Sequence, residues 1–193
     1  MFTLIDNFYD YNDLGIMTLY FMNLPFNQTY QSQAWKVSNR LQAYPCYETQ
    51  VFNESDVKDS PYHIFKKTLE KKTNIKPLLI QSLFRKIKLN ELKNSSVYQK
   101  DRPHKDNIDF DYAGLIYFNS NSLKDGTKLY LEENDFDPTV IIGAKVNRCI
   151  FYDTQQPHST PVDQNVEERW VQPFMLITKE STYEKHKEII TNK

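Results

Sequence analysis

The sequence contains a short His-x-Asp segment that could bind a metal ion. His104 and Asp106 lie in the segment RPHKDN. In an extended chain, residues two apart project from the same side, so an imidazole nitrogen and a carboxylate oxygen can reach one ion. A third ligand must come from another strand, and His158, in QQPHSTP after an apolar run, is placed for that role. Two histidines and one carboxylate on one side of an ion form a facial triad, which suits non-haem Fe(II) that activates O2.

The His-x-Asp triplet by itself also has a simpler interpretation. His104 can be a histidine of a surface loop, and Asp106 can be a turn residue. The two remaining histidines are weaker candidates for a metal site. His63 lies in a predicted helix, and His186 lies in the charged segment EKHKE, where a solvated helix face is expected.

An arginine on a predicted strand adds a second chemical feature. Arg169 begins the segment RWVQPFMLIT, and strand alternation places it on the same face as Val171 and Met175. A guanidinium directed into an apolar interior needs a fixed anion, because an unpaired buried charge is very unfavourable. A carboxylate that accepts two parallel hydrogen bonds is its natural partner. Alternatively, Arg169 reaches solvent or pairs with Glu167 or Glu168.

The elements that must position these residues are mostly strands of the second half. Short runs of β-forming residues alternate there with turn-rich segments, NSNSLKDG and NDFDP among them. This pattern indicates an antiparallel sandwich or barrel. We expect strands at Val97–Gln99, Ala113–Asn119, Thr127–Glu132, Thr139–Ile142, Arg148–Asp153 and Arg169–Thr178.

Helices are expected near both ends of the chain. Leu14, Met17 and Phe21 form an apolar stripe with helical spacing, with Asn12 as the expected N-cap. The pair Ser60 and Pro61 is a typical helix start, with a cap followed by proline at the first helical position.

The remaining segments complete an α+β organisation. Residues 180–190 are predicted to form a terminal helix, residues 76–88 a strand, and residues 39–59 mostly a loop. We expect one domain over residues 1–193. Within it, residues 1–95 support the core, residues 96–179 form the β core with the metal site, and residues 180–193 form the C-terminal helix.

Composition excludes several classes of protein. The chain has 193 residues, of which 14% are aromatic, so it can bury one substantial core. The net charge of −1 argues against a nucleic-acid or anionic-membrane partner. No apolar run approaches the ~20 residues that a membrane span needs. Two cysteines, Cys46 and Cys149, form no disulfide framework, so we expect a reducing, cytoplasmic environment.

The order and spacing of the motifs resemble the 2-oxoglutarate- and Fe(II)-dependent oxygenases, most of all their prolyl-4-hydroxylase-like branch. Three further segments carry the resemblance besides His-x-Asp and the distal histidine. GLIYFN is similar to the family strand that follows His-x-Asp, DGTKLYL to its glycine-containing turn into a strand, and NRCIFYDTQQPHS to the strand that delivers the second histidine. Together they cover roughly residues 96–179.

The resemblance implies a fold and a set of residue roles. The fold is a double-stranded β-helix, which is a jelly-roll or cupin-like core, with flanking helices at both ends. His104, Asp106 and His158 would bind the catalytic Fe(II). Arg169 would clamp the C5 carboxylate of 2-oxoglutarate, and Tyr117 would donate a hydrogen bond to it.

Two further positions qualify the cosubstrate site that the resemblance implies. Tyr98 corresponds to a tyrosine near the cosubstrate, although the connection from it to His-x-Asp is shorter than is usual in the family. Val171 stands where the family often has Ser or Thr, so the clamp lacks one hydroxyl.

The implied activity is that of an Fe(II)/2-oxoglutarate dioxygenase, with O2 as the oxidant. Asp106, where the halogenating variant of the fold has a small residue, favours hydroxylation. The substrate would be a peptide or protein side chain or a small metabolite. Two alternatives stay open: a cupin-like metal-binding or interaction module without oxygenase turnover, and a structural domain in which His104 and Asp106 are loop residues. No motif indicates the oligomeric state.

Overall fold

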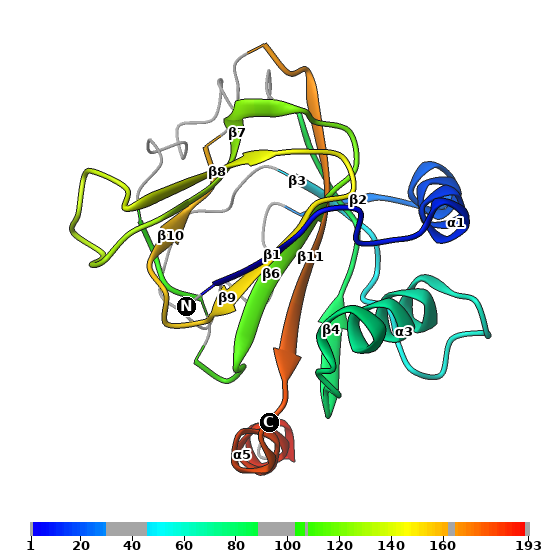
Figure 1. Ribbon diagram of the computed structural model, residues 1–193. Coiled ribbons are helices and arrows are strands. Elements are labelled where there is room, and N and C mark those ends of the chain that lie inside the picture. Colours follow the sequence, from blue (N-terminus) through cyan, green and yellow to red (C-terminus); the bar gives the residue numbers. More distant parts are fainter. Residues whose placement is uncertain (1, 30–45, 89–102, 107, 162–164, 192–193) are drawn as a thin grey trace.

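A computed structural model describes residues 2–29, 46–88, 103–106, 108–161 and 165–191. Its strands form two antiparallel sheets, and three helices flank them within these residues (Figure 1). The α+β double-stranded β-helix expected from the resemblance is therefore confirmed. No helix in these ranges is long and apolar enough to cross a membrane.

The large sheet combines strands from both halves of the chain. Its central strands are β9, β6 and β11, and the N-terminal strand β1 pairs with β9 at one edge. Strand β4 pairs with one end of β11 and β5 with the other. In order across the sheet, the strands are β1 (Phe2–Ile5), β9 (Cys149–Asp153), β6 (Tyr112–Tyr117), β11 (Glu168–Ile177), β5 (Arg85–Lys88), β3 (Cys46–Glu48) and β2 (Asn27–Thr29), with β4 (Leu79–Ser82) beside β11.

The small sheet faces one side of the large sheet, and two helices cover the other. The small sheet consists of β10 (His158–Ser159), β7 (Ser122–Leu129) and β8 (Val140–Ala144). Helices α1 (Tyr11–Asn23) and α3 (Pro61–Thr73) pack on the opposite face (Figure 1).

Strand β6 shows how alternation in the sequence builds these layers. Ala113, Leu115 and Tyr117 point toward the small sheet, where they pack with Leu129 and Ile142. The intervening side chains of β6 and β9 point the other way, into an aromatic-rich core beneath the helices. Since both faces of the central strands are covered, β6 and β9 are apolar along almost their whole length.

Some predicted element boundaries need correction. The N-cap of α1 is Asp10 and not Asn12, because the Asp10 carboxylate accepts a hydrogen bond from the backbone N–H of Asp13 at 2.9 Å. Helix α3 begins at Pro61 as predicted, and the final helix α5 (Glu180–Thr191) matches its predicted range closely. The predicted strand over residues 76–88 is two strands, β4 and β5.

Two predicted loops contain strands. β3 lies within residues 39–59, of which 39–45 fall outside the described residues. β7 begins at Ser122, inside a segment predicted to be a turn, because its pairing with β8 passes through a bulge between Ser122 and Gly126. The glycine therefore marks a bulge in a strand and not the end of a turn. The predicted strand Val97–Gln99 lies outside the described residues.

Asp111 attaches the C-terminal helix to the sheet. Its buried carboxylate accepts hydrogen bonds from the backbone N–H groups of Thr178 and Lys179, at 2.7 and 2.9 Å, and from the Thr182 hydroxyl at 2.8 Å. Burial raises the pKa of Asp111, but these hydrogen bonds outweigh it and leave the pKa below its usual value of 3.8.

The substitution Asp111→Asn tests this attachment. We expect a loss of roughly 1–3 kcal/mol in the free energy of unfolding at pH 7, because the amide replaces a charged acceptor of several hydrogen bonds. Since the folded-state pKa is lowered, the carboxylate stabilises the fold above about pH 4 and loses this effect as the pH falls further. Urea denaturation at neutral and acid pH measures both effects. The exposed Asp137→Asn should change neither, and equal stability of Asp111→Asn and wild type at pH 7 would contradict the assignment.

Candidate metal centre

The two candidate histidine ligands are joined by their backbones. The N–H of His104 donates to the carbonyl of His158, and the N–H of His158 donates to the carbonyl of His104, both at 2.9 Å. Residues paired in this way lie directly opposite each other in an antiparallel ladder, and their side chains project from the same face. Accordingly, the centres of the two imidazole rings are 4.4 Å apart.

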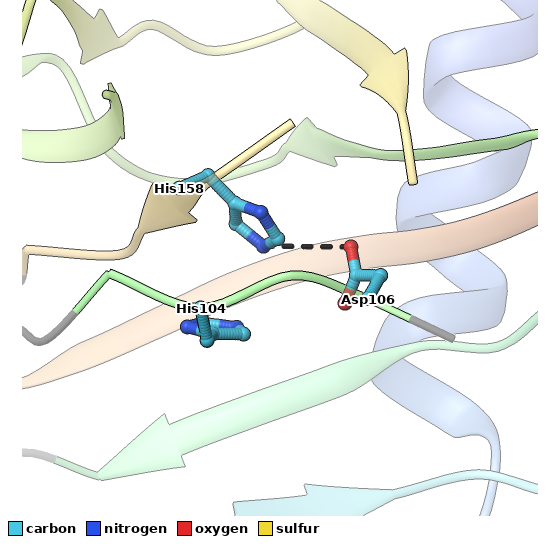
Figure 2. A group of neighbouring side chains, drawn as sticks. All are labelled: His104, Asp106 and His158. Carbon is cyan, nitrogen blue, oxygen red and sulfur yellow. Dashed lines mark ion pairs between the residues drawn. The ribbon is translucent and has the colours of Figure 1, made fainter. Parts of the chain in front are cut away.

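Asp106 joins them through the same strand geometry. Its N–H donates to the carbonyl of Thr154 at 2.9 Å, so the chain stays extended beside the segment that leads to His158. Being two residues from His104, Asp106 projects from the same side. One ligand atom from each of the three residues lies within 4.8 Å of the others. Figure 2 shows the three side chains as neighbours, with His158 on a different segment from His104 and Asp106. The structure thus brings together the three residues predicted from the sequence.

The protonation state of His158 suits a metal ligand. Its ring is buried, and Nδ1 lies 3.0 Å from the carbonyl oxygen of Gln156. Because a carbonyl only accepts hydrogen bonds, Nδ1 carries the proton and Nε2 keeps its lone pair. Burial lowers the pKa of His158 to about 4, so the ring is neutral at pH 7. The 3.4 Å contact between Nε2 and the Asp106 carboxylate is therefore not an ion pair at that pH.

The donor set fits a first-row divalent metal. Ligands bonded to one such ion at about 2.1 Å lie roughly 3 Å from each other, and small side-chain rotations would close the observed separations to that value. Two imidazoles and one carboxylate from neighbouring strand segments make up the donor set. This composition is typical of non-haem Fe(II) sites.

Arg169 is directed into the interior, as its position on the strand predicts. Its side chain is fully buried, with the guanidinium carbon 5.2 Å from the centre of the Tyr117 ring. Nη1 donates to the carbonyl of Pro161 and Nη2 to the carbonyl of Gly126, both at 3.1 Å. Arg169 therefore does not reach solvent, and the Glu168 carboxylate accepts a hydrogen bond from Trp170 at 2.6 Å.

The charge of Arg169 is balanced by a residue that sequence reasoning missed. Asp125 is fully buried on β7, and its Oδ1 lies 3.1 Å from Nη1 of Arg169. From the sequence, this aspartate is only the first residue of the glycine-containing segment DGTKLYL. The sequence indicates only that a buried Arg169 needs an anion, and it does not indicate which residue supplies that anion.

Of the two tyrosines predicted at the cosubstrate site, the structure describes only Tyr117. The hydroxyl of Tyr117 shares a hydrogen bond of 2.9 Å with the hydroxyl of Thr127, which connects the large sheet to the small one. Burial raises the pKa of Tyr117, so its hydroxyl stays protonated. Tyr98 lies outside the described residues.

Tyr152, which the sequence did not single out, lies between the two groups. Its ring is 4.6 Å from that of His158. Burial raises its pKa well above 10, the negative charge of Asp106 raises it further, and the positive charge of Arg169 lowers it. Tyr152 belongs to the same apolar cluster as Tyr117, and the Tyr117 ring lies beside the Arg169 guanidinium, so the triad and the guanidinium border one cluster between the two sheets.

A separate surface hollow of about 380 Å³ lies between α1 and α3. Its lining carries both signs of charge, including Asp13, Lys58 and Glu70. None of the three candidate metal ligands lines it, so it is not part of the candidate centre.

Comparison with known proteins supports the fold through structure alone. No protein-family profile and no curated protein sequence matches the chain. Solved structures do match. An oxidoreductase of the 2-oxoglutarate-Fe(II) oxygenase family from Burkholderia pseudomallei is 9% identical, with a TM-score of 0.60 over 92% of this chain and 86% of that one.

Two other matching structures contain bound molecules. A prolyl hydroxylase from Trichoplax adhaerens, in complex with a peptide fragment of the hypoxia inducible factor oxygen degradation domain, is 13% identical, with a TM-score of 0.56 over 94% and 86% of the two chains. HygX from Streptomyces hygroscopicus, with nickel, 2-oxoglutarate and hygromycin B bound, is 10% identical, with a TM-score of 0.57 over 93% and 83%. The chain thus has the fold of these oxygenases over more than 90% of its length.

Single substitutions test the metal centre. We expect His104→Ala, Asp106→Ala and His158→Ala each to weaken binding of Mn(II) by at least about 100-fold, since loss of an outer partner alone commonly costs 10- to 100-fold. Isothermal titration of the metal-free protein measures the affinity, and circular dichroism verifies folding. His63→Ala is the matched control, because His63 lies on helix α3, where its ring contacts the Asp56 carbonyl and the Tyr62 ring. Folded variants that bind Mn(II) as tightly as the wild type would contradict the assignment of these residues as metal ligands.

Proposed function

We propose that this protein is an Fe(II)- and 2-oxoglutarate-dependent dioxygenase that hydroxylates a peptide side chain or a small metabolite. The single observation that carries the proposal is the convergence of His104, Asp106 and His158 within a fold shared with such oxygenases. When bound, Fe(II) together with 2-oxoglutarate and O2 supplies the oxidising power to hydroxylate a C–H bond.

The residues of this chain would hold and insulate the iron. The paired backbones of His104 and His158 fix the two imidazoles, and the Gln156 carbonyl keeps the His158 ring in the tautomer that presents Nε2. Apolar side chains between the two sheets, with Leu115 and Val171 among them, pack in one cluster with Tyr152, whose ring lies beside His158. An apolar environment of this kind strengthens electrostatic contacts with a bound cosubstrate.

Arg169 would orient the far end of the cosubstrate. The Tyr117 ring packs beside its guanidinium, and Tyr117 shares an apolar cluster with Tyr152, whose ring lies beside His158. The carbonyl groups of Pro161 and Gly126 hold the guanidinium in place, so its position does not depend on a ligand.

Two kinds of substrate are compatible with the fold. One matching structure contains a peptide fragment and another contains hygromycin B, a small molecule. Shared fold does not fix the substrate, because specificity comes from the residues around each site. The net charge of −1 favours a peptide or small molecule over a nucleic acid.

The second candidate function is a metal-binding or interaction module that does not turn over. The observation that favours it is the ion pair between Arg169 and Asp125, since this guanidinium is neutralised without any ligand. A module of this kind would bind Mn(II) through the triad but would bind no 2-oxo acid at the metal.

Production of succinate tests the oxygenase. We expect the Fe(II)-loaded protein, given 2-oxoglutarate and O2, to release succinate even without a substrate, because these oxygenases decarboxylate the cosubstrate slowly when uncoupled. His158→Ala should abolish this release through loss of the metal, and His63→Ala should retain it. Mass spectrometry quantifies succinate, with an iron-free sample as background. An iron-loaded wild-type protein that releases none would contradict the proposal.

A further inference from the structure

Arg169 and Asp125 form a charge-neutral pair in the dry interior. Both side chains are fully buried, and Nη1 lies 3.1 Å from Oδ1. Arg169 reaches inward from the large sheet and Asp125 from the small sheet, so the pair spans the space between them. A buried guanidinium of this kind ordinarily requires one anion, and the protein itself supplies it.

The pair is incompletely hydrogen bonded. The Nη1 and Nη2 groups of Arg169 donate to backbone carbonyls, while Nε has no hydrogen-bond partner within the described part of the chain. Neither carboxylate oxygen of Asp125 accepts a hydrogen bond from these residues either. Buried polar atoms are rarely left in this state, so the attraction between the two charges and the backbone contacts of Arg169 hold the pair, without a hydrogen bond to Asp125.

The backbone holds Asp125 in place. Gly126 follows it with a φ of 151°, a conformation that other residues rarely adopt, at the bulge where β7 meets β8. On the next residue, the Thr127 hydroxyl is hydrogen bonded to Tyr117 of the opposite sheet. Asp125 is therefore fixed from its C-terminal side and cannot turn outward to solvent without disturbing these contacts.

This arrangement changes what the guanidinium can bind. The C5 carboxylate of 2-oxoglutarate would approach Arg169 beside the carboxylate of Asp125, and one guanidinium would then face two negative groups in a low-dielectric interior. Like charges held this close in a desolvated site repel strongly. An uncharged end meets no such repulsion and leaves the existing ion pair intact.

We propose that Asp125 sets the selectivity of the cosubstrate site, so that the site accepts 2-oxo acids with an uncharged end at least as well as 2-oxoglutarate. This inference rests on the proposed function, because the 2-oxo acid is taken to bind at a metal held by the triad. Asp125 is a specificity residue in this proposal and takes no part in the chemistry.

Two ligands test the proposal on the wild-type protein. 2-Oxopentanoate has the same number of carbon atoms as 2-oxoglutarate, with a methyl group in place of the distal carboxylate. Isothermal titration into Mn(II)-loaded protein gives the dissociation constant of each without turnover. We expect 2-oxopentanoate to bind as tightly as 2-oxoglutarate or more tightly. A clear preference for 2-oxoglutarate, about tenfold or more, would overturn the proposal.

The substitution Asp125→Asn gives the second test. It removes the negative charge and retains the shape, so we expect 2-oxoglutarate to bind about tenfold more tightly and 2-oxopentanoate to change by less than about threefold. Asp137→Asn removes the same charge from an exposed position and should change neither value. A folded, Mn(II)-binding Asp125→Asn protein with an unchanged affinity for 2-oxoglutarate would overturn the proposal. If this variant does not fold, the wild-type comparison still decides.

The two proposals fail in different ways. If neither 2-oxo acid binds to the Mn(II)-loaded wild type, the oxygenase function and the selectivity are both overturned. If 2-oxoglutarate binds and releases succinate but is strongly preferred over 2-oxopentanoate, the oxygenase function stands and only the role of Asp125 is lost.

Discussion

The backbone pairing between His104 and His158 is the contact on which the candidate site depends. Two reciprocal hydrogen bonds place these residues directly opposite each other, and this alone puts both imidazoles on one face. A slip of one residue in either segment would turn one ring to the other side. No additional contact is needed to place the third ligand, because Asp106 is two residues along the same extended segment. The register of the strands thus determines how the three candidate ligands are arranged.

That register is in turn held by the packing of the two sheets. His158 pairs with Leu129 of β7, and Leu129 packs against apolar side chains of β6, β9 and β11 in the interior. At another point of β7, the ion pair of Asp125 with Arg169 and the hydrogen bond of Thr127 with Tyr117 connect the same sheets through polar contacts. Directional polar contacts of this kind fix the relative position of two layers more sharply than apolar packing does. Their unfavourable desolvation is offset only where the partners are accurately placed.

The parts of this arrangement that follow from local rules could be predicted from the sequence. Alternation along β11 correctly indicated that Arg169 faces inward, and the spacing of His104 and Asp106 correctly indicated a shared face. The proline after Ser60 marked the start of α3.

What could not be predicted depends on contacts between distant segments. Asp125 lies 44 residues before Arg169 and looks like a turn residue beside a glycine, because nothing local reveals the bulge that keeps it within a strand. Likewise, nothing near Asp111 in the sequence indicates that it accepts hydrogen bonds from Thr178 and Lys179, just before the final helix.

The ion pair between Asp125 and Arg169 bears on how a buried charge is interpreted. From the sequence, Arg169 requires an anion, and resemblance to the oxygenases makes a cosubstrate carboxylate the natural choice. The physical requirement is only for one negative charge, whatever its source, and the interior of the protein contains it already. A buried guanidinium therefore does not by itself indicate an anionic ligand. The proposed oxygenase chemistry rests instead on the three candidate metal ligands, whose side-chain atoms converge within the fold shared with these oxygenases.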